Sequence, residues 1–161
     1  MTTPIVDAHA HFWDPLRLHY PWLKMAPQLQ QTFGLREYQQ ASASLPIEKL
    51  VFVECNCQPE QSPDEVAWVT QMAGMDPRIQ GIVAYADLTN TQRIDTVLAN
   101  YRQHPLIRGI RHNIQWNPKG FALQPAFAAG IHKVQQAGFH FELCCTYDQL
   151  DEVLKLVQLC E

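Results

Sequence analysis

Two histidines near the start of the chain, His9 and His11, give the strongest chemical signal in the sequence. They belong to the run DAHAH at residues 7–11. Alternate side chains of a β-strand share one face, so Asp7, His9 and His11 are expected to point the same way. Two imidazoles spaced in this way can converge on one metal ion, each through a ring nitrogen. The competing interpretation is a pair of structural histidines, but the preceding apolar strand and the following Phe12 and Trp13 favour a functional pair.

A second candidate group, Arg111 and His112, ends a later apolar run. Strand alternation sends these two side chains to opposite faces. Arginine suits the planar, bidentate recognition of a carboxylate or a polarised carbonyl, although a salt bridge at the same place would serve only structure. A single histidine such as His112 is more often a hydrogen-bonded core residue.

Glu54 and Trp13 are weaker candidates for a binding site. Glu54 is the only acidic residue in the apolar run 49–56, and a carboxylate in such a setting needs a metal ion or an arginine beside it. Trp13, Tyr20 and Trp22 fall in a long segment between two apolar runs. Aromatic rings there can pack against a sugar or a ring face of a substrate, or they can simply anchor the segment.

The elements that must position these residues alternate between strands and helices. Short apolar runs typical of parallel strands occupy residues 4–11, 49–56, 79–87, 107–113 and 138–145. Helical patterns follow them, with a capping box predicted at Ser62–Glu65 and another at Thr146–Gln149, and with Gly138 expected just past a helix end. Strand followed by helix indicates an α/β fold with a parallel sheet. The long first connection, residues 13–45, is expected to be a lid or a binding loop.

Composition excludes several classes of protein. Hydrophobic residues make up 47% of the 161 residues and charged residues 17%, which excludes intrinsic disorder. A net charge of −4 argues against a nucleic-acid partner. No apolar run approaches the ~18 residues of a membrane span, and the first residues lack the features of a signal peptide. Five cysteines without a C-x-x-C pair indicate reduced thiols, so we expect a cytoplasmic protein.

Several motifs together resemble a known family. The run DAHAHFWDP at residues 7–15, followed by YPWL at 20–23, is similar to the start of the amidohydrolase-related (amidohydrolase 2) family. The resemblance is greatest to its sugar-lactonase and dicarboxylate-lactone hydrolase branch. It continues in order through VFVECN (51–56), IVAYADL (82–88), IRGIRHNIQ (107–115) and FHFELCCTYDQL (139–150), and so covers nearly the whole chain.

The resemblance implies a (β/α)8 TIM-type barrel, of which this chain would hold about five units as one incomplete domain, residues 1–161. Eight units at the same spacing would need about 258 residues, close to the ~250 of a typical barrel. The open edges of the first and last strands would then favour homo-oligomers.

The resemblance also implies an activity, hydrolysis of a lactone by attack of water. One divalent metal, Zn or Mn, would be bound by His9 and His11, although some members of the family need none. Arg111, His112, Glu54 and Trp13 would contact the substrate. The general base would be an acidic residue of a later strand that has no counterpart in this sequence.

Two other interpretations stay open. The chain could be a truncated, catalytically inactive fragment of such an enzyme. It could also be a metal-dependent deoxyribonuclease of the same barrel superfamily, whose members also begin with D-x-H-x-H. The acidic net charge and the lack of a basic groove argue against the nuclease.

Overall fold

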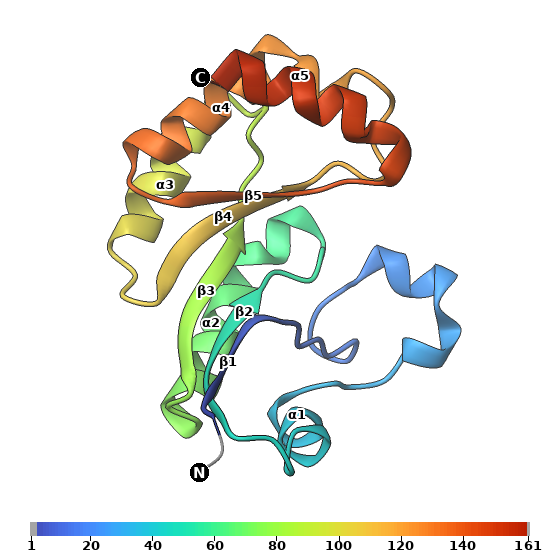
Figure 1. Cartoon of the computed structure of the whole chain (residues 1–161), viewed down its shortest axis with the longest axis vertical. Coiled ribbons are helices and arrows are strands. Elements are labelled where there is room, and N and C mark those ends of the chain that lie inside the picture. Colours follow the sequence, from blue (N-terminus) through green and yellow to red (C-terminus); the bar gives the residue numbers. More distant parts are fainter. Residues whose placement is uncertain (1–2, 161) are drawn as a thin grey trace. The chain divides into compact units, whose positions relative to one another are not determined.

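The computed structural model describes residues 3–160 of the chain (Figure 1). The chain divides into two compact units, Met1–Ala84 and Tyr85–Glu161, and each is described by itself. Strands and helices alternate along both units, as the apolar runs predict.

The first unit contains a parallel sheet in the order β1-β2-β3. Its strands are β1 (Ile5–Ala10), β2 (Ile47–Val53) and β3 (Ile79–Tyr85), the last of which reaches the boundary between the units. Its helices are α1 (Leu35–Ala41) and α2 (Ser62–Met75), with short 3-10 turns η1 (Pro21–Met25), η2 (Pro27–Leu29) and η3 (Pro59–Gln61). Phe12, Phe52 and Ile82 are among the fully buried side chains of its core.

The second unit pairs β4 (Ile107–Asn113) with β5 (His140–Cys144), in parallel and in unbroken register from Gly109 to Asn113. Its helices are α3 (Ile94–Arg102), α4 (Pro125–Gln136) and α5 (Leu150–Cys160), and its 3-10 turns are η4 (Phe121–Leu123) and η5 (Tyr147–Gln149). In Figure 1, α4 and α5 lie together on one side of the β4–β5 pair.

Helix ends follow the sequence signals in two of three places. Gly138 lies just past α4 with φ +82°, a backbone conformation that glycine adopts without strain. The Thr146–Gln149 capping box is present, with the Thr146 N–H donating to the Gln149 side chain at 3.0 Å. The predicted capping role of Glu65 is wrong. Its carboxylate is turned inward, is 1% exposed and accepts the Cys55 N–H at 3.2 Å.

Helix α5 presents its apolar stripe to the surface. Leu150, Leu154 and Val157 are each more than half exposed, whereas Glu152 and Leu156 are buried. Both Glu152 carboxylate oxygens accept backbone N–H groups, from Gly120 and Ala122, at 2.7 Å each. Within the second unit, the buried Glu152 carboxylate therefore ties α5 to the backbone at Gly120 and Ala122.

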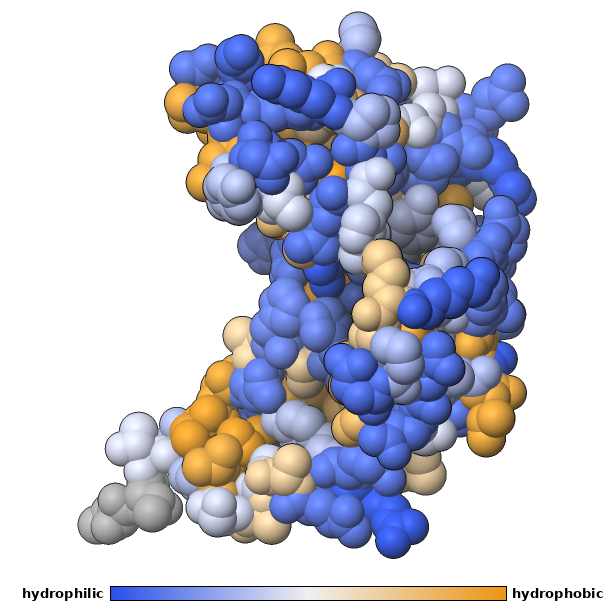
Figure 2. Space-filling view, turned by 90° about the vertical axis from the view of Figure 1, so that its right-hand side faces the viewer, coloured by the Kyte–Doolittle hydropathy of each residue, from blue (hydrophilic) through white to orange (hydrophobic). Residues whose placement is uncertain are grey.

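Hydrophobic residues on the face drawn in Figure 2 form patches separated by hydrophilic surface. Among the exposed apolar side chains of the structure are Ile5 and Val6 of β1. Within residues 3–160, no helix is both long enough and apolar enough to cross a membrane.

Gly130 provides a test of the packing in the second unit. A Cβ at this buried position of α4 would lie 2.5 Å from the Leu88 carbonyl oxygen, so Gly130→Ala forces α4 away from the segment after β3. We expect this change to lower the free energy of unfolding by about 1–3 kcal/mol, measured by urea denaturation.

Gly74→Ala is the matched control, because Gly74 is exposed in α2 and a Cβ added there would meet no atom within 4 Å. This change should leave stability unchanged or raise it by up to ~1 kcal/mol. A Gly130→Ala protein as stable as the unmodified chain would contradict the close packing of α4 on Leu88.

Candidate functional site

The two histidines of the DAHAH run converge at the carboxyl end of β1. Their Nε2 atoms lie 3.1 Å apart, and their rings meet edge to face with centroids 4.8 Å apart. Both side chains are exposed to solvent. His11 is also bonded through its other nitrogen, since Nδ1 lies 2.8 Å from the backbone oxygen of Val53 on β2.

The contact with Val53 decides which nitrogen of His11 is available for chemistry. A carbonyl oxygen only accepts, so His11 carries its proton on Nδ1 and leaves a lone pair on Nε2. Metal-binding histidines are oriented in this way by an acceptor at the second nitrogen. Two nitrogens bound to a tetrahedral ion at 2.0–2.1 Å would lie about 3.3 Å apart, close to the observed separation. The pair therefore fits two positions of one divalent ion.

Further ligands for such an ion are not assembled in the first unit. Within residues 3–160, no group of three or more His, Cys, Asp or Glu side chains is arranged to hold a metal ion. The aspartate of the DAHAH run does not turn to the imidazoles; its carboxylate accepts the Tyr38 hydroxyl at 2.8 Å. The pair alone supplies two ligands, one fewer than the three protein ligands of a typical catalytic zinc site.

Glu54 lies at the end of β2 and is 1% exposed. One of its carboxylate oxygens accepts the Asn56 N–H at 2.7 Å. Asn56 has φ +51°, a left-handed conformation that is uncommon for residues other than glycine and is best tolerated by asparagine and aspartate. A buried carboxylate therefore stands in a tight turn directly after the strand.

The two cysteines that follow Glu54, Cys55 and Cys57, are both buried. Burial, together with the carboxylates of Glu65 and Glu54, raises the pKa of the Cys57 thiol well above its usual range. The Cys55 thiol donates to the Phe12 carbonyl oxygen at 3.1 Å. This arrangement supports the interpretation of both residues as packing groups, because a metal ligand would be a thiolate.

Trp13 belongs to an aromatic cluster of the long first connection. Its ring lies 4.6 Å from that of Phe33 and 5.6 Å from that of Trp22, centroid to centroid. Both indole N–H groups are used: Trp13 donates to the Leu29 carbonyl oxygen at 3.0 Å, and Trp22 to that of Cys55 at 2.7 Å. The connection is thus anchored to the end of β2, and the half-buried faces of the rings are what a ligand could reach.

His112, in the second unit, is enclosed by aromatic rings. Tyr85, Phe121 and Phe127 surround its imidazole at centroid distances of 5.2 to 5.6 Å. Its Nδ1 accepts the Leu88 N–H at 3.2 Å. Burial lowers the pKa of His112, and the nearby Asp87 carboxylate only partly opposes this. The geometry is that of a neutral, packed imidazole, and we do not assign it a contact with substrate.

Arg111 is buried in β4, and strand alternation places it on the face opposite His112. The register of the sheet pairs it with Glu142 of β5, so both side chains lie on one face of the two strands. Glu142 is half-buried. The Glu142 carboxylate could orient the Arg111 guanidinium, and the guanidinium could then donate to an anionic or carbonyl oxygen.

Tyr38 is the residue near the histidines that the sequence interpretation missed. It lies on α1, a helix that the analysis of residues 13–45 did not predict. The one available signal is Glu37, three residues after Gly34, whose carboxylate accepts the Gly34 N–H at 2.9 Å. That spacing is typical of a helix start.

Comparison with known proteins gives the chain a family and a fold. The sequence profile described as amidohydrolase matches residues 6–161. A zinc-bound crystal structure of an amidohydrolase from Burkholderia multivorans superposes with a TM-score of 0.81 at 21% identity, covering 98% of this chain and 55% of that one. The predicted fold is confirmed: the five strand–helix units correspond to part of a (β/α)8 barrel.

Two further similarities are to proteins described as a lactonase and as a probable hydrolase. The L-fucono-1,5-lactonase of Burkholderia multivorans is 26% identical over 92% of this chain and 49% of its own length. A crystal structure described as a probable 2-pyrone-4,6-dicarboxylic acid hydrolase from Acinetobacter baumannii has a TM-score of 0.71 at 15% identity, covering 95% of this chain and 54% of that one. The chain spans about half the length of the curated relatives it matches.

The neutral His112 predicts a pH dependence of stability. Its pKa in the folded chain lies below the value of about 6.5 expected after unfolding. The unfolded chain therefore binds more protons, and this contribution to stability is present above pH ~6.5 and is lost as the pH falls below it. His112→Gln removes the titration and keeps an acceptor for the Leu88 N–H.

We expect the free energy of unfolding, measured in urea between pH 7.5 and pH 5.5, to fall less steeply for His112→Gln than for the unmodified chain. The slopes are compared, so a constant loss of stability in the variant does not affect the test. Parallel pH profiles for the two proteins would show that His112 does not titrate as its burial requires.

Proposed function

Since the chain belongs to the amidohydrolase family, we propose that it acts as a hydrolase of lactones of sugar acids or dicarboxylates, with one divalent metal ion, Zn or Mn, bound by His9 and His11. The observation that supports this most is the convergence of their Nε2 atoms to 3.1 Å, with His11 Nδ1 held by Val53. The lactonase relative and the zinc-bound neighbour agree with this proposal but share little sequence with the chain.

The histidine pair would hold the ion by two neutral nitrogens. A divalent ion in such a site polarises a carbonyl and lowers the pKa of water. The His11 Nδ1–H donates to the Val53 carbonyl oxygen. This hydrogen bond fixes the tautomer and the ring orientation in which the Nε2 lone pair is available to the ion. His9 is exposed, and in the tautomer that carries the proton on Nδ1 its Nε2 lone pair would be available to the ion.

Arg111 is our candidate for binding the substrate's carboxylate or carbonyl oxygen. The planar fork of its guanidinium matches the geometry of a carboxylate. Glu54 and Trp13 remain candidates for further substrate contacts. We assign the role of general base to none of the described residues, since the family resemblance implies an acidic group on a later strand.

The proposal is tested by metal analysis and by assay of the 161-residue chain with a panel of sugar 1,4- and 1,5-lactones in the presence of Zn²⁺ or Mn²⁺. His9→Ala and His11→Ala should each lower metal occupancy and reduce hydrolysis by about 100-fold or more, as expected for loss of a group that stabilises the transition state. The matched control is His132→Ala, an exposed histidine of α4, which should behave as the unmodified chain.

Three other results would argue against the proposal. Hydrolysis that survives both histidine substitutions would place the chemistry elsewhere. No hydrolysis above buffer with either metal would support the inactive-fragment interpretation. Metal-dependent cleavage of DNA, with no lactone hydrolysis, would support the deoxyribonuclease.

A further inference from the structure

Strand β1, which contains His9 and leads directly into His11, has one residue more than β2 between Asp7 and Ala10. Asp7 pairs with Leu50 and Ala10 with Phe52, so three steps along β1 match two steps along β2. Such β-bulges bend a strand and redirect its side chains, and they are frequent next to active sites.

The bulge bears on the distance between the His9 and His11 side chains. In a regular strand, alternate residues lie roughly 6.5–7 Å apart along the chain, given a rise of 3.2–3.4 Å per residue. The Nε2 atoms of His9 and His11 nevertheless lie 3.1 Å apart. The register shift falls between Asp7 and Ala10, where His9 is attached, so a bulge there would redirect the His9 side chain.

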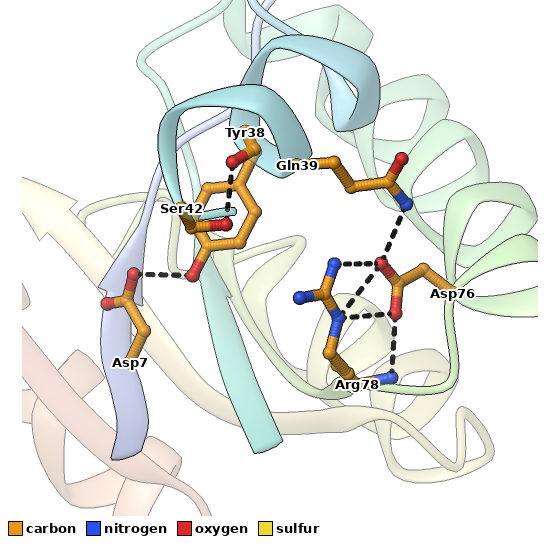
Figure 3. Close-up of polar contacts among 6 residues, drawn as sticks. All are labelled: Asp7, Tyr38, Gln39, Ser42, Asp76 and Arg78. Carbon is orange, nitrogen blue, oxygen red and sulfur yellow. Dashed lines mark hydrogen bonds and ion pairs between the residues drawn. The ribbon is translucent and has the colours of Figure 1, made fainter. Parts of the chain in front are cut away.

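The Asp7 side chain supports the backbone at the bulge. Its Oδ1 accepts the N–H of His9 at 3.2 Å, and its Oδ2 accepts the Tyr38 hydroxyl at 2.8 Å. Figure 3 shows Asp7 on β1 facing the Tyr38 hydroxyl from α1. One carboxylate thus connects the bulged backbone to a helix.

Tyr38 is itself held on several sides. Its ring meets that of Phe12 edge to face at 5.6 Å, and the Arg78 guanidinium lies 6.0 Å from the ring centroid. The next residue of α1, Gln39, donates to Asp76 at 3.1 Å, and Asp76 also binds Arg78 (Figure 3). Burial and the bond to Asp7 raise the pKa of Tyr38 to about 12, so its hydroxyl is a donor throughout the physiological range.

We propose that Tyr38 is a positioning residue for the histidine pair: its hydroxyl fixes the Asp7 carboxylate on the His9 N–H, and this holds the bulge that directs His9 toward His11. The inference rests on the proposed metal-binding function and extends it to a residue of α1. If Tyr38 served only to anchor α1, its loss would lower stability without affecting the histidines.

The test compares Tyr38→Phe with the unmodified 161-residue chain. Phenylalanine keeps the ring contacts with Phe12 and Arg78 and removes only the hydroxyl. We expect the Kd for Zn²⁺, measured by chelator competition, to rise by about 10-fold, the lower end of the effect of losing an outer-sphere partner. In the metal-free protein, hydrogen exchange of the His9 N–H should become about fivefold faster, as the support of its hydrogen bond is lost.

Two further variants separate positioning from stability. Gln39→Ala breaks the neighbouring contact of α1 with Asp76 and should leave both the Zn²⁺ affinity and the His9 exchange rate unchanged. Asp7→Ala should weaken Zn²⁺ binding as Tyr38→Phe does, and the double variant should be no weaker than Asp7→Ala alone, because Tyr38 acts through Asp7. Asp7→Asn, which keeps an acceptor, should recover part of the affinity.

Unchanged His9 exchange in Tyr38→Phe would overturn the inference, as would additive losses in the double variant or an equal loss of affinity in Gln39→Ala. If the unmodified chain binds no Zn²⁺, the proposed function fails by that result alone. The exchange rate of the His9 N–H in metal-free protein then still decides whether Tyr38 holds the bulge.

Discussion

The hydrogen bond between His11 Nδ1 and the Val53 carbonyl oxygen is the constraint on which the first unit's chemistry depends. It joins the residue after β1 to the last residue of β2, and it leaves His11 with only Nε2 to offer. That nitrogen lies 3.1 Å from Nε2 of His9. The pairing of β1 with β2 thus helps to bring together two nitrogens that could bind one metal ion. Without the Val53 acceptor, the ring could rotate and either nitrogen could carry the proton.

The long first connection contributes to the same site from two directions. Its aromatic cluster is fastened to the end of β2 by the Trp22 indole, and its helix α1 reaches β1 through Tyr38. A connection of this length is expected to be functional rather than a simple link, and here its helix α1 supports β1 through the bond from Tyr38 to Asp7.

Most of the fold could be predicted because it follows from local patterns. β4 has the predicted ends, Ile107 and Asn113, and the caps at Gly138 and Thr146 lie where the residue types require them. The failures arise where a tertiary contact overrides a local one. Glu65 has the spacing of a capping residue, but the buried Cys55 N–H attracts its carboxylate inward. The seven-residue helix α1 is too short to produce a periodic signal.

The candidate site was predictable in its residue types and not in its geometry. The spacing of His9 and His11 suggested a shared metal ion, but a bulge depends on the pairing of two strands and has no signature in one of them. The surroundings of His112 could not be predicted either, since its aromatic neighbours Phe121 and Phe127 come from later elements. Tyr38 is 31 residues from Asp7 in sequence, and only the folded chain brings them together.

The most direct test of this account is X-ray absorption spectroscopy of the Zn²⁺-loaded protein, which measures the atoms bound to the ion. The account predicts two imidazole nitrogens at about 2.0–2.1 Å, completed by oxygen ligands, and loss of this imidazole signal in a protein that lacks either His9 or His11. A spectrum with sulfur at about 2.3 Å, or an imidazole signal that persists without these two histidines, would contradict it.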